Sequence, residues 1–277
     1  MAVSTKEQFY PWTDVIIESW QQFEESVGEL ASRDWVFRGQ CDANWELQTS
    51  ISRLFDDVME MKAAKSGKVM KFDRHAREKI MIESFIAGAH LYIQRFPEEK
   101  DLLEWLAIMQ HHGAPTRLLD VTFSPYIALY FALERGNQEC CVFAFNHKEL
   151  YRKFEESIFE TKDYKIELFK YHHREKSFII PYEPKIKTER ILAQQGLFLI
   201  PSNINKLESF QTILSRYNVN RKVCIRYRIS PTLRYQGLVW LRKMNITSTS
   251  LFPGLDGFCR SIGFEVIESL QRLGRVY

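Results

Sequence analysis

Apolar residues in this chain follow two spacings in turn, and this alternation constrains the fold more than any other feature of the sequence. Steps of three and four residues, which place apolar side chains on one face of a helix, occur at residues 16–30, 73–96, 102–109 and 255–266. Short aromatic and β-branched runs, typical of strands, occur at residues 35–37, 117–122, 140–145, 190–200 and 223–229. The interleaving predicts an α+β fold in which helices wrap a mixed or antiparallel sheet.

Local start and stop signals set the ends of several elements. Pro97 ends the second predicted helix, and Gly113 is a C-terminal cap for the third. Ser124-Pro125 and Ser230-Pro231 each place a capping hydroxyl before a first-turn proline, which predicts a helix directly after each pair. Residues 146–176 are charged, aromatic and weakly periodic, and no element is predicted there.

Length and composition are those of a globular protein with one core. The 277 residues, of which 45% are hydrophobic, suffice to bury a large core without disulfides or metals. No repeat, low-complexity tract or linker divides them, so a single compact domain is expected. The formal net charge of +3 is too balanced to favour nucleic acid or a membrane surface as partner. No secretory signal and no run of roughly 18 to 20 apolar residues is found, which predicts a soluble, cytoplasmic protein.

Neither a disulfide framework nor a metal site is predicted. The five cysteines, an odd number, include the adjacent Cys140 and Cys141 and show no CxxC spacing. We interpret them as reduced and mostly buried. The histidine pairs at 111–112 and 172–173 lack further ligands at metal-binding spacing.

Two blocks of sequence carry a family resemblance. The first is FRGQ at residues 37–40, followed by Trp45 and Leu47, and the second is WLAIMQHHGAPTRLLDVTFSPYIALYFA at residues 105–132. Further matches are Arg190, AQQGLF at residues 193–198 and LFPGLDG at residues 251–257. Together, in this order, the motifs closely resemble the FRG domain family.

The resemblance implies a domain organisation and a biological setting. It spans residues 31–265 as the FRG domain, with an N-terminal helix at residues 1–30 packed on it and the end of a C-terminal helix at residues 266–277. It also implies a bacterial or phage intracellular protein, in some cases associated with defence or toxin loci.

A second resemblance, to ADP-ribosyltransferases, is confined to short motifs. Their first motif is an aromatic residue, an arginine and a glycine at a strand end, as at residues 37–39. Their second is a strand with hydroxyl side chains followed by a helix, which residues 120–132 resemble. This resemblance implies NAD as a substrate. Their third motif supplies a glutamate, and this chain departs from it with Gln194 and Gln195.

Arg38 is the first candidate for ligand contact, with Gly39 and Gln40 beside it. A guanidinium presents a rigid fork of donors that suits a phosphate or carboxylate and keeps its charge at any working pH. In an NAD site Arg38 would hold the diphosphate. The structural alternative is an ion pair with Asp120 or Asp42 that fixes a loop.

The histidines at the end of the third predicted helix are candidates for sugar contact or proton transfer. His111 and His112 precede a loop of the kind whose side chains converge on clefts. Because adjacent side chains rarely face the same way, one of the two is expected to be structural.

Four polar residues, Thr116, Arg117, Asp120 and Thr122, interrupt an apolar stretch and need hydrogen-bond partners if buried. One interpretation is an internal network that orders the core. The other places Asp120 and Thr122 in a cleft with Arg38, where the carboxylate orients the guanidinium and the hydroxyl meets a sugar.

Gln195 is a candidate for placing an amide over a ligand. A bulged strand with solvent-facing glutamines at 194 and 195 explains the same residues, and the structural interpretation is favoured. The polar run at residues 248–250 is interpreted as a loop and cap for the last helix.

The favoured functional hypothesis is a protein that binds a small anionic nucleotide such as NAD, with ADP-ribosyltransferase or NAD glycohydrolase activity as its enzymatic form. Cleavage of the nicotinamide–ribose bond requires anchored phosphates and a negative or hydrogen-bonding group near the ribose. Arg38 would anchor, Asp120 would orient, and a histidine would contact the sugar. The alternative is a non-catalytic module that senses an anionic ligand or a protein partner. Nucleic-acid cleavage ranks last, because carboxylates for paired metals and a basic stripe are missing.

Overall fold

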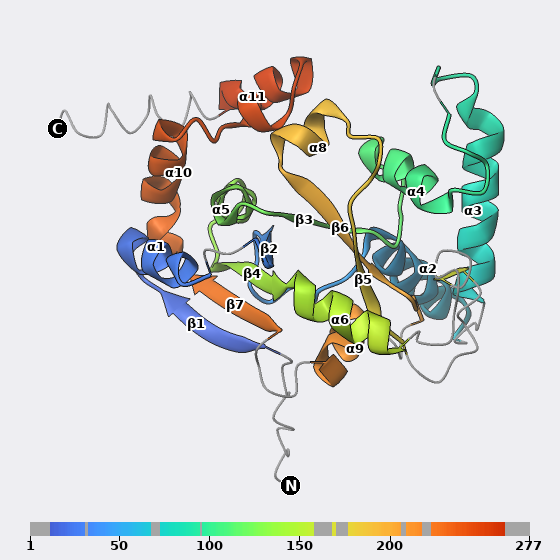
Figure 1. Ribbon diagram of the computed structural model, residues 1–277, viewed down its shortest axis with the longest axis horizontal. Coiled ribbons are helices and arrows are strands. Elements are labelled where there is room, and N and C mark those ends of the chain that lie inside the picture. Colours follow the sequence, from blue (N-terminus) through green and yellow to red (C-terminus); the bar gives the residue numbers. More distant parts are fainter. Residues whose placement is uncertain are drawn as a thin grey trace, which may run out of the picture.

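The computed structural model describes residues 12–30, 33–67, 73–94, 96–157, 168–169, 177–205, 209–217 and 223–263. Within these ranges the strands form a seven-stranded sheet of order β1-β7-β4-β2-β3-β6-β5 (Figure 1). The strands are β1 (Thr13–Ile17), β2 (Trp35–Gln40), β3 (Leu119–Thr122), β4 (Cys140–Asn146), β5 (Ile179–Tyr182), β6 (Gly196–Pro201) and β7 (Cys224–Ile229). β1 and β7 are parallel and the other pairs are antiparallel. The predicted α+β fold with a mixed sheet is confirmed.

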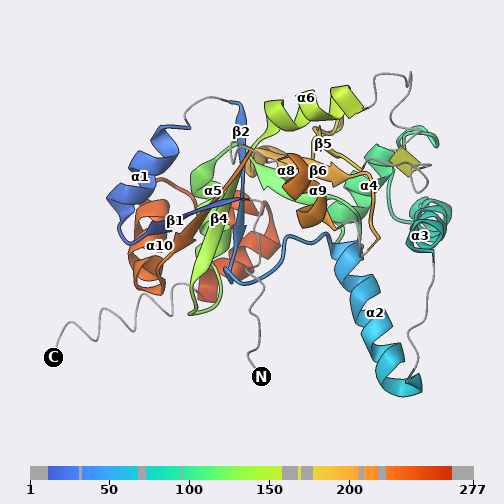
Figure 2. The same ribbon diagram turned by 90° about the horizontal axis from the view of Figure 1, so that it is seen from below.

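Helices cover both faces of the sheet (Figures 1 and 2). One face packs against α5 (Pro125–Leu133), α1 (Trp20–Gly28) and α10 (Arg234–Lys243), which η3 (Pro231–Leu233) precedes. The opposite face packs against α6 (His147–Ser157) and α9 (Phe210–Tyr217). Strands β5 and β6 share a further core with α3 (Arg74–Ala89) and α4 (Leu102–His111).

Three helices lie nearer the periphery. α2 (Ser50–Ser66) projects away from the sheet, as Figure 2 shows. α8 (Glu189–Ala193) precedes β6, and α11 (Ser248–Leu251) lies near it (Figure 1). Residues 255–263 are also helical.

The start of α5 confirms the sequence interpretation at the centre of the fold. The Ser124 hydroxyl accepts a hydrogen bond from the Ile127 amide at 3.3 Å, and Pro125 occupies the first turn. Ala128 and Ala132 in this helix are almost fully buried. At the end of α4, Gly113 has a φ of 83°, which glycine adopts without steric strain.

The predicted helix over residues 16–30 begins too early. Residues up to Ile17 belong to β1, and α1 starts at Trp20 after a capping box between Ser19 and Gln22. Ile16 is two-thirds exposed, so its match to the helical spacing was coincidental. Pairing with β7 decides the conformation of this segment, and that strand lies more than 200 residues away in the sequence.

The predicted strand or strand pair over residues 190–200 is wrong in its first half. Residues up to Ala193 form α8, and β6 begins only at Gly196. Between them Gln195 has a φ of 47°, an uncommon conformation for a residue other than glycine. A Thr188 cap at the helix start outweighs the strand-like composition.

Gly39 lies inside strand β2, although the sequence motif predicts that Arg38 and Gly39 stand where the strand gives way to a turn. Strand β2 continues through Gly39 to Gln40, so Arg38 lies inside the strand. A Cβ atom on Gly39 would lie 1.9 Å from the carbonyl oxygen of Ala128 in α5. Glycine is therefore required for the close approach of the strand and the helix.

One further boundary differs from the prediction by several residues, and several elements were not predicted. α3 ends at Ala89, well before Pro97. The sequence interpretation did not anticipate α2, α6, α9 or β5. The predictions for residues 1–11 of the N-terminal helix, for His172 and His173, and for the end of the last predicted helix with the segment 266–277 lie outside the described residues. In the described part of the chain, no helix combines the length and apolarity needed to cross a membrane.

Candidate functional site

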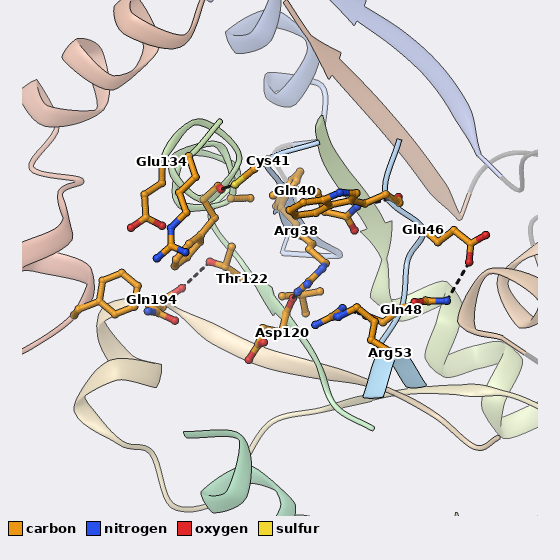
Figure 3. A pocket seen from close by; sticks show the side chains of 18 of the residues that line it. Arg38, Gln40, Cys41, Glu46, Gln48, Arg53, Asp120, Thr122, Glu134 and Gln194 are labelled. Carbon is orange, nitrogen blue, oxygen red and sulfur yellow. Dashed lines mark hydrogen bonds between the residues drawn. The ribbon is translucent and has the colours of Figure 1, made fainter. Parts of the chain in front are cut away.

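A cavity of about 890 Å³ opens between β2, β3, α5 and the loop that follows β2 (Figure 3). Its walls also take residues from α2, α8 and the segment after α10. Five arginines line it together with three acidic residues, so it carries a net excess of two positive charges. The charged residues are Arg38, Arg53, Arg135, Arg190, Arg260, Glu46, Asp120 and Glu134. Such a lining favours an anionic ligand.

Four consecutive residues of β2, from Phe37 to Gln40, line this cavity, and their side chains alternate between the two faces of the sheet. Successive side chains of a strand point to opposite faces of a sheet. Phe37 packs into the core that includes α5, and Gly39 faces the same helix. Arg38 and Gln40 therefore share the other face with Val36, which lies in the core under α6 and α9.

Arg38 lies in the middle of the cavity lining (Figure 3). Its Nη1 donates to the backbone carbonyl of Asp120 at 2.8 Å. Its Nε is buried and has no hydrogen-bond partner among the described residues. The guanidinium also forms no ion pair with a carboxylate in that part of the chain. The predicted structural alternative, an ion pair with Asp120 or Asp42, is therefore not formed.

Burial shifts the titration of Arg38. Desolvation lowers the pKa of its guanidinium from the usual value, and the nearby negative charge of Asp120 acts in the opposite direction. Arginine nevertheless keeps its charge at neutral pH. A partly buried cation without an ion-pair partner is unfavourable for folding, which makes Arg38 a candidate for ligand contact.

Asp120 is positioned by a short hydrogen-bonded chain. Its carboxylate accepts from Gln110 Nε2 at 2.7 Å, and Gln110 Oε1 accepts from the Thr116 hydroxyl at 2.6 Å. Thr116 is fully buried, and its amide donates to Ser50 Oγ at 2.9 Å. Thr116 thus does not line the cavity but holds a residue that does.

Thr122 lines the cavity, yet its hydroxyl is already engaged. It donates to the carbonyl of Gln194 at 2.7 Å and accepts from the Ser124 amide at 3.0 Å. Gln194 in turn donates its amide to the carbonyl of Leu251 at 3.1 Å. These bonds tie β3 to the turn after α8, as the dashed line in Figure 3 shows for the Thr122 bond.

Arg117 forms a buried ion pair away from the cavity. Its Nε donates to Glu78 Oε1 at 2.7 Å, and its Nη2 pairs with the other carboxylate oxygen. Its Nη1 donates to the carbonyls of Leu168 and Ser202, each at 3.3 Å. Both charged side chains are almost completely buried, so this pair joins α3 to the core.

The two histidines and Gln195 also lie outside the cavity lining. The rings of His111 and His112 contact each other edge to face at 4.9 Å. Burial lowers the pKa of His111, assisted by the nearby charges of His112 and Arg190. Gln195 is exposed on the turn before β6. The structure thus brings together Arg38, Gly39, Gln40, Asp120 and Thr122 from the predicted site, and separates Thr116, Arg117, His111, His112 and Gln195 from it.

Further cavity residues were not predicted from the sequence. Arg190 and Arg260 place their guanidinium groups 5.0 and 4.0 Å from the ring centre of Phe252, and Arg260 pairs with Glu134 at 3.2 Å. Arg190 and Phe252 belong to the family-like motifs, so a signal for them existed. Arg53 had none, because an exposed arginine on a polar helix is unremarkable in sequence.

Metal-ligating side chains do not cluster within the described ranges, where no group of three or more His, Cys, Asp and Glu is placed to hold an ion. The arrangement of the cavity instead offers hydrogen-bond donors to an anion. Arg38 and Arg190 form no ion pair with a described carboxylate, and each lines the same cavity.

Comparison with known proteins gives one positive result. Residues 33–140 match the FRG domain family model. No curated protein and no solved structure gives a significant match. The matched segment supplies Arg38, Arg53 and Asp120 and most of the cavity lining, whereas Arg190, Phe252 and Arg260 follow it in the sequence. The chain therefore contains an FRG domain, at residues 33–140.

Proposed function

We propose that the cavity binds an anionic nucleotide, with Arg38 donating to its phosphate or diphosphate group. The observation that carries this proposal is the partly buried Arg38 guanidinium, which lines the cavity and forms no ion pair with a described carboxylate. A bound phosphate would provide the missing counter-charge and accept charge-assisted hydrogen bonds. Arg53 and Arg190 on the same lining add to the attraction for an anion.

NAD is the nucleotide to test first, because the motif around Arg38 resembles that of ADP-ribosyltransferases. Cleavage of its nicotinamide–ribose bond would develop positive charge on the ribose, which a carboxylate stabilises. Asp120 and Glu134 line the cavity and are the carboxylates available for this role, together with Glu46. His111 and His112 do not line it, so the predicted sugar contact by a histidine has no structural support.

The test follows NAD binding and nicotinamide release together in the purified protein. Wild-type protein is compared with Arg38→Ala and with Arg77→Ala, an exposed arginine on α3 outside the cavity. We expect Arg38→Ala to weaken NAD binding by about 10- to 150-fold, the value of a hydrogen bond to a charged group, and Arg77→Ala to leave it unchanged. Equal NAD affinity in a folded Arg38→Ala variant would contradict the proposal.

Nicotinamide release distinguishes the enzymatic form from a second candidate, a non-catalytic sensor of the same ligand. The hydrogen bonds of Gln194 and Thr122 favour the sensor. Thr122 belongs to the motif that resembles a transferase site, and Gln194 stands near the place where the third transferase motif has a glutamate, yet both side chains are engaged within the protein. Binding without release would support the sensor, and release by wild type but not by Arg38→Ala would support the enzyme.

A role in defence or as a toxin, and a cytoplasmic location, remain predictions from the family resemblance and the sequence. We propose to test the toxin hypothesis by inducing the wild-type chain and Arg38→Ala in a bacterial host and counting colonies. Loss of viability with the wild type alone would link toxicity to the cavity. Equal viability at equal protein levels would argue against a toxin that acts through Arg38.

A further inference from the structure

Trp45 is the most exposed of the six tryptophans, and it lines the cavity. Its exposed fraction is 57%, against 37% for Trp240. Trp240 stacks on Trp20 at 6.0 Å and has the Lys243 ammonium 4.3 Å from its ring centre. The Trp45 indole makes no comparable ring or cation contact with any described residue. Trp45 therefore offers an exposed aromatic face to a ligand in the cavity.

The backbone around Trp45 is held firmly, so its exposure is not that of a loose loop. Ala43 and Leu47, two residues to either side, are almost fully buried. The Ala43 amide donates to the carbonyl of Glu139 at 2.9 Å. The carbonyl of Trp45 itself accepts from Gln40 Nε2 at 3.1 Å, and Gln40 is buried next to Arg38 on β2. The strand that carries the anion-binding arginine therefore also positions the tryptophan.

We propose that Trp45 is a stacking platform for the base of the nucleotide, so that the cavity recognises an aromatic base and a phosphate together. This inference rests on the proposed function, since it adds a base contact to the anion held by Arg38. Aromatic side chains stack on any base, because every base has a π-face. The ligand class is thus a nucleotide of one or two bases rather than a simple phosphate or sugar phosphate.

The charge of the cavity alone does not require a base. Five arginines would also attract inorganic diphosphate or a sugar phosphate. The attraction of the arginines for phosphate and the stacking of a base on Trp45 can be measured separately. The indole should favour ligands that carry an aromatic ring over those that do not. Trp45 and Arg38 belong to different parts of the lining, one on the loop and one on the strand, so each can be replaced without removing the other.

The experiment measures dissociation constants of ADP, NAD and inorganic diphosphate for wild type, Trp45→Ala, Trp45→Phe and Arg38→Ala by calorimetry. We expect Trp45→Ala to weaken ADP and NAD by about 5- to 150-fold and to leave diphosphate unchanged. Trp45→Phe should bind within a few-fold of wild type. Arg38→Ala should weaken all three ligands.

Tryptophan fluorescence provides an independent readout. A stacked base should quench the emission of wild type and of Trp240→Phe, and the quenching should disappear in Trp45→Phe. Unchanged ADP and NAD affinity in Trp45→Ala, with loss in Arg38→Ala, would overturn this inference and leave the proposed function standing. Equal loss of diphosphate and nucleotides in Trp45→Ala would show a structural role and would also overturn it. If wild type bound none of the three ligands, the proposed function would fail and the base platform with it.

Discussion

The guanidinium of Arg38 donates to the backbone carbonyl of Asp120, at 2.8 Å, and not to the Asp120 carboxylate. That carboxylate accepts instead from Gln110. The two charges are close enough for Asp120 to act on the pKa of Arg38, yet they do not neutralise each other through a direct ion pair. The arrangement leaves both groups available to a ligand in the cavity.

Replacement of Arg38 should therefore separate stability from binding. In Arg38→Met we expect a free energy of unfolding within about 1 kcal/mol of wild type, because the change removes one hydrogen bond and also an unfavourable desolvated charge. Nucleotide affinity should fall while the fold is kept. Urea denaturation monitored by circular dichroism gives the first quantity and calorimetry the second. A loss of several kcal/mol would instead identify Arg38 as structural.

Arg117 should behave in the opposite way. Its removal in Arg117→Met leaves the Glu78 carboxylate buried without its partner, which costs about 3–5 kcal/mol. The double variant Glu78→Leu/Arg117→Met should be more stable than Arg117→Met, because it also removes the orphaned charge. A double-mutant cycle in urea measures the coupling. Additive effects of the two changes would contradict the role assigned to this pair.

Gly39→Ala should destabilise the protein by about 2 kcal/mol or more, because the new methyl group would overlap the Ala128 carbonyl and push α5 from β2. Gly88→Ala is the matched control. Gly88 is the last residue but one of α3, and apart from its chain neighbours and the backbone of its own helix no atom lies within 4 Å of the position of its Cβ. This change should stabilise the helix by about 0.5–1 kcal/mol. Thermal unfolding measures both effects. The midpoint temperature should fall in Gly39→Ala and rise in Gly88→Ala.

Thiol reactivity should separate the five cysteines. Cys259 is exposed and should react first with a disulfide reagent at pH 8. Burial raises the pKa of Cys140 and Cys141 to about 12 and also raises the pKa of Cys41 and Cys224, so the thiolate fraction of these four residues at pH 8 is reduced. The rates of these thiols should rise with pH, as each pKa is approached.

In the control variant Cys259→Ser, the fast reaction with the disulfide reagent that is assigned to Cys259 should be absent.

Cys41 lines the cavity, with its thiol 3.1 Å from the carbonyl of Phe131, so saturating nucleotide should slow the reaction of Cys41 with the disulfide reagent. A rate for Cys41 that does not change with nucleotide would place the ligand elsewhere.

The sequence by itself determined the elements whose signals are local. Capping and first-turn proline residues fixed α5 and η3, and apolar composition identified β4 and β7. The motif around Arg38 identified the residue at the centre of the cavity lining. These features depend on neighbours in the sequence, so they can be read without the fold.

Tertiary structure decided the rest. β1 forms because it pairs with β7, and the Asp14–Arg226 ion pair in that contact joins residues 212 positions apart. The packing of β2, β3 and α8 brings Arg53, Arg190 and Trp45 together with Arg38 in the cavity lining. The same packing leaves His111 and Arg117 outside that lining. Sequence spacing specifies which face of an element a side chain occupies. Which faces meet is set by packing between elements far apart in the chain, and here that packing created the cavity.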